Sequence, residues 1–267
     1  MPLRFLRNLA LSVIFMVFFA GWGSDVRPLP NGKEIGIVLM HGKDGNTRYV
    51  DDLAGRLSSA DIHVLTPDMP WHKKRIYDKT FEDSMKEINQ YVEKLRAQGV
   101  KKVFVAGHSL GAVAAAGYGA TFGDIDGIIL LAPGHFTGFK GFRERFSNEV
   151  ARAKAMIKEG KGDQAGRFGD INMGSTSDRY VSAEIYYSWF APGGPADFAS
   201  NMARLKNGMA VLYIAGEKDS TPGSRDKGYA FDKAPRNDKS LFFTVPSDHL
   251  SVPGDSDRIV LDWLRKF

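Results

Sequence analysis

Six short runs of consecutive apolar residues, separated by amphipathic segments, constrain the fold of this chain more than any other feature. They occupy residues 37–40, 62–65, 103–106, 128–131, 211–215 and 241–245. Each run is nearly continuous in hydrophobicity rather than alternating, which is typical of parallel strands that are buried on both faces. Strands that alternate with helices form βαβ units. The pattern therefore predicts an α/β fold with a mostly parallel sheet flanked by helices.

Three of the intervening segments have the apolar spacing of an amphipathic helix. The first follows a predicted N-cap at Thr47, the second follows Thr80 and ends at Gly99, and the last begins near Ser256. Because each segment carries one apolar stripe, we expect each helix to pack against the sheet.

The interval 134–208 breaks this alternation. It lies between the predicted strand that ends near Leu131 and the strand that starts near Val211, and it is far longer than a crossover helix requires. Its several helix-like pieces predict a helical insertion, or cap, over the sheet. No internal repeat or proline-rich linker separates it from the rest, so residues 25–267 are predicted to form one domain.

The first 24 residues have the pattern of a targeting segment. Arg4 and Arg7 precede an apolar stretch over residues 9–20 that only Ser12 interrupts. A bilayer-spanning helix needs about 20 apolar residues, so the length favours a cleavable signal peptide. An uncleaved membrane anchor and a buried N-terminal helix are the alternatives. The two leading interpretations predict an exported protein, periplasmic or secreted, or one that this segment holds at the membrane.

The residue inventory excludes several classes of function. Lysine and arginine number 36 against 31 aspartates and glutamates, which is too small an excess to indicate nucleic-acid binding. The absence of cysteine excludes thiol catalysis, disulfides and cysteine-ligated metals. The six histidines form no His-x-x-x-His pair, and we predict neither a metal nor a cofactor.

The sequence Gly-His-Ser-Leu-Gly at residues 107–111 matches Gly-x-Ser-x-Gly, in which the serine occupies a sharp strand-to-helix turn. A match this short often arises by chance, so the neighbouring sequence must show whether the motif marks a nucleophile. The motif directly follows the apolar run 103–106 and directly precedes the small residues 112–116, which can pack close to such a turn. This placement predicts that Ser109 is a nucleophile.

From about residue 36 to its C-terminus the chain resembles the α/β-hydrolase superfamily, in which the nucleophile precedes the acid and the acid precedes the histidine. The resemblance implies that Asp219, in a Gly-x-x-Asp sequence after the fifth apolar run, is the acid and that His249 is the base. Glu217 and Asp226 are alternatives for the acid. In such a triad the imidazole takes the proton of the serine hydroxyl, and the buried carboxylate orients the imidazole.

The same resemblance implies an oxyanion hole made of two backbone N–H groups, those of Leu110 and Lys43. Because the donors belong to the main chain, the path set by Gly42 and Gly45 is expected to matter more than the side chain of Lys43. We expect the Lys43 ammonium either to face solvent or to meet an anionic group of the substrate.

Ligands of open α/β sheets bind beyond the carboxyl ends of the strands, which here include the insertion. The candidates for lining the substrate site are Trp71, His135, Phe136 and Trp189, with Tyr77, Phe139, Tyr186, Tyr187 and Phe190 as further aromatic residues. An apolar wall of this kind would suit an acyl chain or an aromatic ester. The same side chains could instead form the small core of the insertion.

These observations predict a serine hydrolase that cleaves a carboxylic ester or thioester of a small molecule through an acyl-enzyme intermediate. Two alternatives stay open. An acyltransferase would use the same residues with an alcohol in place of water in the second step. A non-catalytic binding protein could be built on the same scaffold.

Overall fold

The computed structural model describes residues 34–267, and the predicted targeting segment lies outside this part of the chain. One six-stranded sheet has the order β2-β1-β3-β4-β7-β8, and each neighbouring pair is parallel. The strands are β1 (Ile35–Met40), β2 (His63–Leu65), β3 (Lys102–His108), β4 (Gly127–Leu131), β7 (Ala210–Gly216) and β8 (Leu241–Val245). All six predicted strands are therefore confirmed, and so is the α/β fold.

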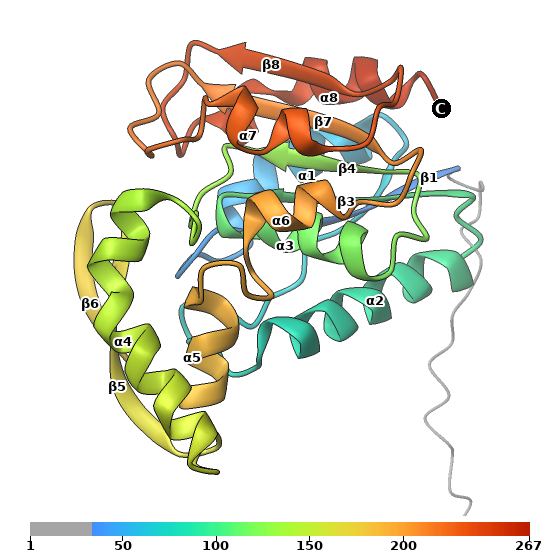
Figure 1. The fold of residues 1–267 in the computed structure, drawn as a ribbon. Helices are drawn as coiled ribbons and strands as arrows, with labels where there is room; N and C mark the ends of the chain where they lie inside the picture. The colour runs from blue at the N-terminus through green and yellow to red at the C-terminus, as the bar shows by residue number, and fades with distance from the viewer. Residues whose placement is uncertain (1–33) are drawn as a thin grey trace, which may run out of the picture.

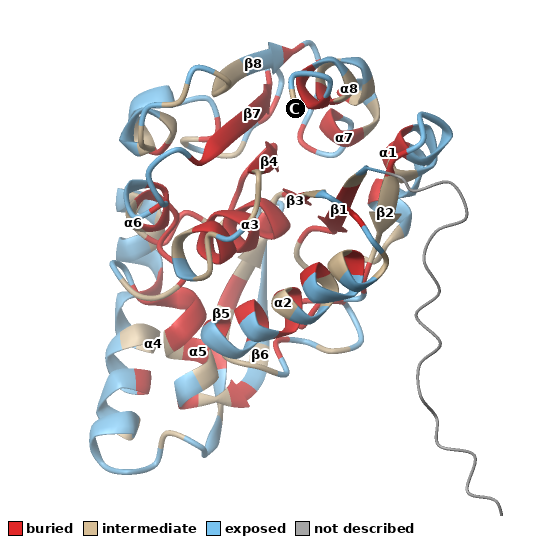
Figure 2. Cartoon of the chain, turned by 90° about the vertical axis from the view of Figure 1, so that its right-hand side faces the viewer, coloured by how far each residue is buried: buried red, intermediate tan, exposed pale blue. Residues whose placement is uncertain are grey.

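Helices cover both faces of this sheet, as Figures 1 and 2 show. One face carries α2 (Phe81–Ala97), α3 (Leu110–Thr121) and α6 (Phe198–Ala203). The other carries α1 (Arg48–Ser59), α7 (Val252–Asp255) and α8 (Asp257–Leu264). Within residues 34–267, no helix combines the length and the apolar character that crossing a bilayer requires.

The four central strands, β1, β3, β4 and β7, are buried on both faces because successive side chains enter different cores. In β1, Val38 and Met40 belong to the core beneath α2 and α3, whereas Ile37 and Leu39 belong to the core beneath α1 and α8. Alternating contacts of this kind require apolar residues at every position, which explains the unbroken apolar runs.

The predicted helix starts are confirmed with one difference in detail. The Thr80 side chain accepts a hydrogen bond from the Asp83 N–H and caps α2. Thr47 occupies the N-cap position of α1, but its side chain makes no capping hydrogen bond. Ser256 is the N-cap residue of α8, as predicted, and the short helix α7 precedes it.

The insertion is helical only in part, which corrects the expectation of a helical cap. It contains α4 (Lys140–Lys158) and α5 (Ala183–Phe190), and between them a two-stranded antiparallel hairpin, β5 (Ala165–Asn172) and β6 (Ser175–Ser182). The hairpin lies beside α4 at the lower left of Figure 1. β6 is largely exposed and β5 is partly buried, and neither strand has the apolar run that identifies the strands of the sheet.

The functional residues lie at a topological switch point of the sheet. β1 pairs with β2 on one side and with β3 on the other, so the connections that follow β1 and β3 leave in different directions. Such a divergence opens a crevice at the carboxyl ends of the strands, where open α/β sheets bind their ligands. Residues 41–45 follow β1, and Ser109 follows β3.

Candidate active site

Ser109 lies in a strained turn between β3 and α3. Its backbone has φ 56° and ψ −116°, a conformation that non-glycine residues rarely adopt. The Ser109 N–H donates to the Leu131 carbonyl over 2.9 Å, and α3 begins at the next residue. The turn therefore raises the serine side chain above the edge of the sheet.

Two glycines make this turn possible because the backbone passes close to its neighbours. A Cβ atom added to Gly107 would lie 2.2 Å from the carbonyl carbon of Gly111. A Cβ atom added to Gly111 would lie 2.7 Å from the His41 carbonyl oxygen. Both distances are too short for a side chain, so packing explains both glycines of the motif.

Ser109, His249 and Asp219 form one hydrogen-bonded array, to which we refer as the array below. The distance from His249 Nε2 to Ser109 Oγ is 2.9 Å, and the distance from His249 Nδ1 to Asp219 Oδ2 is 2.8 Å. The three residues follow β3, β8 and β7 in the sheet. These residues are far apart in sequence, but they meet because the parallel strands that precede them end at the same edge of the sheet.

Asp219 is the acid that contacts His249, whereas the two alternatives are engaged elsewhere. Glu217 accepts from Thr244 Oγ1 at 3.5 Å, and Asp226 accepts from the Tyr229 N–H at 3.2 Å. Burial of Asp219 opposes its ionisation, but the hydrogen bond and charge interaction with His249 outweigh burial and lower the Asp219 pKa. An ionised carboxylate beside Nδ1 favours the tautomer in which Nε2 accepts the serine proton.

The main chain of His249 is held by His108, the residue before the serine. The His108 side chain is buried, and its Nε2 donates to the His249 carbonyl over 2.8 Å. Burial, and then the proximity of His249, lowers the pKa of His108 to about 4. His108 is therefore neutral at pH 7 and acts as a hydrogen-bond donor that positions the His249 loop.

The two predicted oxyanion donors flank Ser109. Within the described residues, neither the Lys43 N–H nor the Leu110 N–H has a hydrogen-bond acceptor. A Cβ atom on Gly42 would lie 3.1 Å from the Ser109 Cβ, so the loop after β1 passes directly beside the serine. Leu110 also stands at the N-terminus of α3, where the helix dipole favours negative charge. Free donors in this position can stabilise an oxyanion.

The Lys43 side chain neither faces solvent nor offers a free charge, which corrects both expectations for it. Its Nζ donates to Asp170 Oδ1 over 2.6 Å and to the Ile171 carbonyl over 2.9 Å. Arg179 contacts the same carboxylate and also pairs with Asp44. Two cations and two anions thus form a neutral network, to which we refer as the ion network, between the loop after β1 and the hairpin.

A cavity of about 460 Å³ opens beside Ser109 and is called the large compartment. Four phenylalanines line it: Phe136, Phe139, Phe142 and Phe146. His135 also lines it, as predicted, and burial lowers the pKa of this histidine to about 3. No carboxylate residue contributes to the lining, and Arg145, which also lines the cavity, has no ion-pair partner within the described residues.

Trp71 and Trp189 do not line this cavity, which corrects their assignment to the substrate site. Both are fully buried, and their indole N–H groups donate to the main-chain carbonyls of His41 and Lys79. Their rings are 5.6 Å apart and belong to the core that joins the insertion to the sheet. They are thus structural, as the alternative interpretation of the aromatic residues proposed.

Several residues that line the large compartment were not predicted from the sequence. Phe142 and Phe146, with Phe139 ahead of them, recur at spacings of three and four residues at the start of α4, a pattern that could have identified a lining face. The hairpin tip at Asn172 and Met173 carried no such signal, because the hairpin itself was not predicted.

A second cavity of about 140 Å³, the small compartment, also borders Ser109 and His249. It shares five lining residues with the large compartment: Lys43, Ser109, Asn172, Met173 and His249. Gly42, Gly45, Tyr49 and Leu250 complete much of its wall. The Ser109 hydroxyl therefore stands where the two compartments meet.

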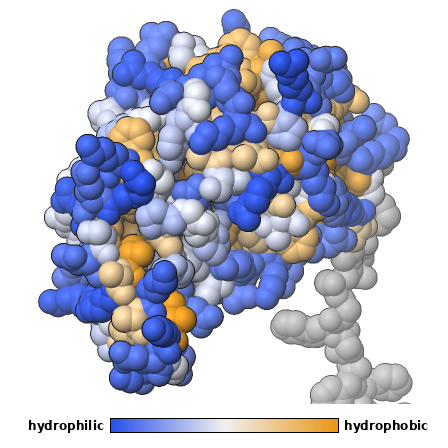
Figure 3. Space-filling model, in the orientation of Figure 1, coloured by the Kyte–Doolittle hydropathy of each residue, from blue (hydrophilic) through white to orange (hydrophobic). Residues whose placement is uncertain are grey.

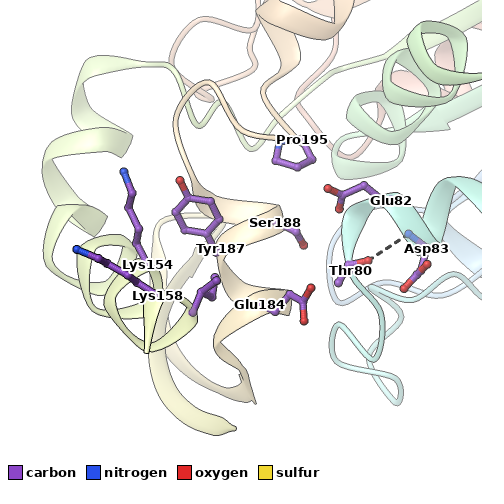
Figure 4. Close-up of a pocket in the computed structure, with 10 residues that line it drawn as sticks. Thr80, Glu82, Asp83, Lys154, Lys158, Glu184, Tyr187, Ser188 and Pro195 are labelled. Atoms are coloured by element: carbon purple, nitrogen blue, oxygen red, sulfur yellow. Dashed lines mark hydrogen bonds between the residues drawn. The ribbon is translucent and has the colours of Figure 1, made fainter. Parts of the chain in front are cut away.

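A wider hollow of about 770 Å³ lies between α2, α4 and α5 (Figure 4). Lys154 and Lys158 line the α4 side, and Glu82 and Asp83 line the α2 side. On the face shown in Figure 3, hydrophobic residues are exposed over the part of the insertion where α4 and α5 lie. Because the lining of this hollow includes no histidine, it lacks the chemistry found at Ser109. Residues 34–267 also contain no cluster of three or more side chains suited to a metal ion.

Comparisons with known proteins agree with this architecture. A family model described as "Alpha/beta hydrolase family" matches residues 37–262, and no curated protein matches the chain. A monoacylglycerol lipase from Paleococcus ferrophilus has 19% identity and a TM-score of 0.61, covering 86% of this chain and 94% of its own. Est1E from Butyrivibrio proteoclasticus, with ferulic acid bound, has 18% identity and a TM-score of 0.60, covering 90% and 93%. A structure described with the metagenome-derived lipolytic enzymes LipS and LipT has 16% identity and a TM-score of 0.63, covering 88% and 95%.

Proposed function

On the basis that the chain belongs to the alpha/beta hydrolase family, we propose that it is a serine hydrolase that cleaves carboxylic ester or thioester bonds. The observation that carries the proposal is the array of Ser109, His249 and Asp219 at the junction of two compartments. The esterases and lipases among the structural neighbours support the same reaction class.

In the proposed first step, Ser109 Oγ attacks the acyl carbon while His249 Nε2 takes the hydroxyl proton. The N–H groups of Lys43 and Leu110 stabilise the negative oxygen of the tetrahedral intermediate. The intermediate collapses when His249 gives its proton to the leaving oxygen, which breaks the bond between the acyl carbon and the alcohol. Water then repeats the sequence on the acyl-enzyme and releases the acid.

Hydrolysis of p-nitrophenyl esters by the full-length chain tests this proposal. We expect turnover in the wild type and its loss in Ser109→Ala and His249→Ala. Inclusion of acceptor alcohols, with analysis of the products, distinguishes a hydrolase from an acyltransferase on the same array. A folded wild type that cleaves no activated ester would favour a binding protein instead.

We also propose that the protein acts outside the cytoplasm, either as a periplasmic or secreted enzyme or held at the membrane by residues 1–24. The basis is the charge and apolar pattern of that segment. N-terminal sequencing of the protein from cell fractions tests the proposal. A start near Asp25 supports cleavage, an intact Met1 in the membrane fraction supports an anchor, and an intact Met1 in the cytosol overturns export.

A further inference from the structure

The two compartments beside Ser109 differ in size and lining, and this difference bears on which ester fits. The large compartment, about 460 Å³, has four phenylalanine side chains in its wall. The small compartment, about 140 Å³, is lined by two glycines, Gly42 and Gly45, and by polar as well as apolar side chains, among them Asp44, Tyr49 and Leu250. A cavity of about 150 Å³ holds a benzene-sized group, so the small compartment takes about six non-hydrogen atoms.

The wall between the compartments is the tip of the β5–β6 hairpin. Asn172 and Met173 line both compartments. Asn172 pairs with Ser175, and the two turn residues Met173 and Gly174 have φ values of 49° and 81°. Two consecutive positive φ values are typical of the tight type I′ hairpin turn, which sets the direction of the Met173 side chain.

The ion network fixes this tip to the loop that carries the Lys43 N–H. Asn172 Nδ2 donates to the Lys43 carbonyl over 3.3 Å and to Asp44 Oδ2 over 3.2 Å. Lys43 Nζ and Arg179 Nε bind the two carboxylate oxygens of Asp170, whose side chain is fully buried. Because buried paired charges are costly to separate, the tip behaves as a fixed wall and not as a lid.

Exposed apolar side chains gather around the small compartment. Within the described residues, Tyr49, Met173 and Leu250 are among the few large apolar residues that are exposed, with exposed fractions of 52%, 57% and 48%. All three line the small compartment, although they come from α1, the hairpin and the loop after β8. Convergence of exposed apolar residues at one cavity is typical of a ligand site.

We propose that Met173 and Asn172 divide the site, so that the large compartment holds the acyl group and the small compartment holds the leaving alcohol. The inference rests on the proposed function and specifies its substrate class: esters of a bulky apolar or aromatic acid with a short alcohol. Of the two oxyanion residues, Lys43 lines both compartments and Leu110 lines only the large one, which favours the acyl carbonyl on that side. His249 lines both compartments and can protonate an alcohol oxygen in the small one.

Two isomeric esters test the orientation directly. Methyl 6-phenylhexanoate has a bulky acid and a small alcohol, whereas 5-phenylpentyl acetate has the same atoms with the ester reversed. Acid release by the full-length chain is followed at constant pH. We expect kcat/KM for the methyl ester to exceed that for the acetate by at least about tenfold, the lower end of discrimination by an apolar pocket.

Substitutions of Met173 test the wall. Met173→Ala joins the compartments and is expected to raise the acetate-to-methyl-ester ratio of kcat/KM at least about fivefold, whereas Met173→Trp lowers this ratio. Tyr180→Ala is the matched control, because Tyr180 lies on the same hairpin, is 77% exposed and lines neither compartment. Its ratio should equal that of the wild type.

The outcomes separate this inference from the proposed function. If a fluorophosphonate labels Ser109 but the wild type cleaves the two isomers equally, or if neither Met173 variant changes the ratio, the division of the site is wrong while the hydrolase stands. If Ser109 is not labelled and neither ester is cleaved, the proposed function fails and this inference fails with it.

Discussion

Lys43 Nζ lies 2.6 Å from Asp170 Oδ1, and this contact joins the loop beside Ser109 to the hairpin of the insertion. The side chain of Asp170 is fully buried and also accepts from Arg179 Nε over 2.9 Å. Burial lowers the pKa of Lys43, and the neighbouring Asp170 carboxylate opposes that change. The insertion is thus bound to the catalytic loop by charge as well as by packing.

Asp170→Asn should destabilise the protein strongly. The substitution keeps the size of the side chain but leaves Lys43 and Arg179 without their shared anion, and breaking a buried pair in this way costs about 3–5 kcal/mol. The free energy of unfolding, measured by urea denaturation, checks the expectation. Asp178→Asn is the control on the same hairpin, because its contact with Arg167 is exposed at the surface. Equal losses of unfolding free energy in the two variants would show that the ion network stabilises the protein no more than an exposed ion pair does.

Gly111→Ala should destabilise the turn at Ser109. The new methyl group would lie 2.7 Å from the His41 carbonyl oxygen, so the loop after β1 or the start of α3 must move. We expect a lower Tm together with a fall in kcat, because the displaced loop also carries the Lys43 N–H. Gly55→Ala is the control: it lies within α1 with nothing within 4 Å of the added atom, and the change should stabilise by about 0.5–1 kcal/mol. A fully active and stable Gly111→Ala would refute this account of the turn.

Trp189 and Phe142 should respond differently to substitution, because one is core and the other lines the large compartment. Trp189→Phe removes the donor to the Lys79 carbonyl and is expected to cost about 1–3 kcal/mol of stability without changing the preference among acyl groups. Phe142→Ala should shift that preference toward longer or wider acyl groups. Hydrolysis of a series of methyl esters of increasing acyl length distinguishes the two effects. A changed acyl preference in Trp189→Phe would show that Trp189 does contribute to the substrate site.

The burial of His108 predicts a loss of stability in mild acid. Its pKa is lowered from 6.5 to about 4, so the unfolded chain takes up the proton first as the pH falls. Stability is therefore lost between about pH 6.5 and pH 4, and this one group accounts for about 2 kcal/mol at pH 5. His108→Gln keeps a donor for the His249 carbonyl but does not titrate. Its unfolding free energy should fall less than that of the wild type between pH 7.5 and pH 5, and an identical fall would contradict the assignment.

The sheet and the array were predictable because their signals are local. Each strand of the sheet is a largely apolar run, Ser109, Asp219 and His249 each come within four residues after such a run, and the resemblance to a known family supplied the roles of Asp219 and His249. Chain order alone then placed them at one edge, since parallel strands present their carboxyl ends together.

The insertion was harder to predict because its structure depends on contacts that are distant in sequence. The hairpin is held by Asp170 and Arg179, whose partners Lys43 and Asp44 are more than a hundred residues away. The same contacts pair the Lys43 ammonium with Asp170, so it does not offer a free charge to a substrate. Trp71 and Trp189 were misplaced for a related reason: an aromatic residue near the site packs as well into a core as into a cavity wall.

The account depends most on the reactivity of Ser109, and fluorophosphonate labelling of the full-length protein measures it directly. We predict that the reagent modifies one residue, that peptide mass spectrometry places the adduct on Ser109, and that Ser109→Ala and His249→Ala are not labelled. Asp219→Asn should be labelled far more slowly, because a misoriented imidazole costs roughly 10⁴-fold in related triads. Labelling that persists in Ser109→Ala, or a folded wild type that does not react, would contradict the central claim.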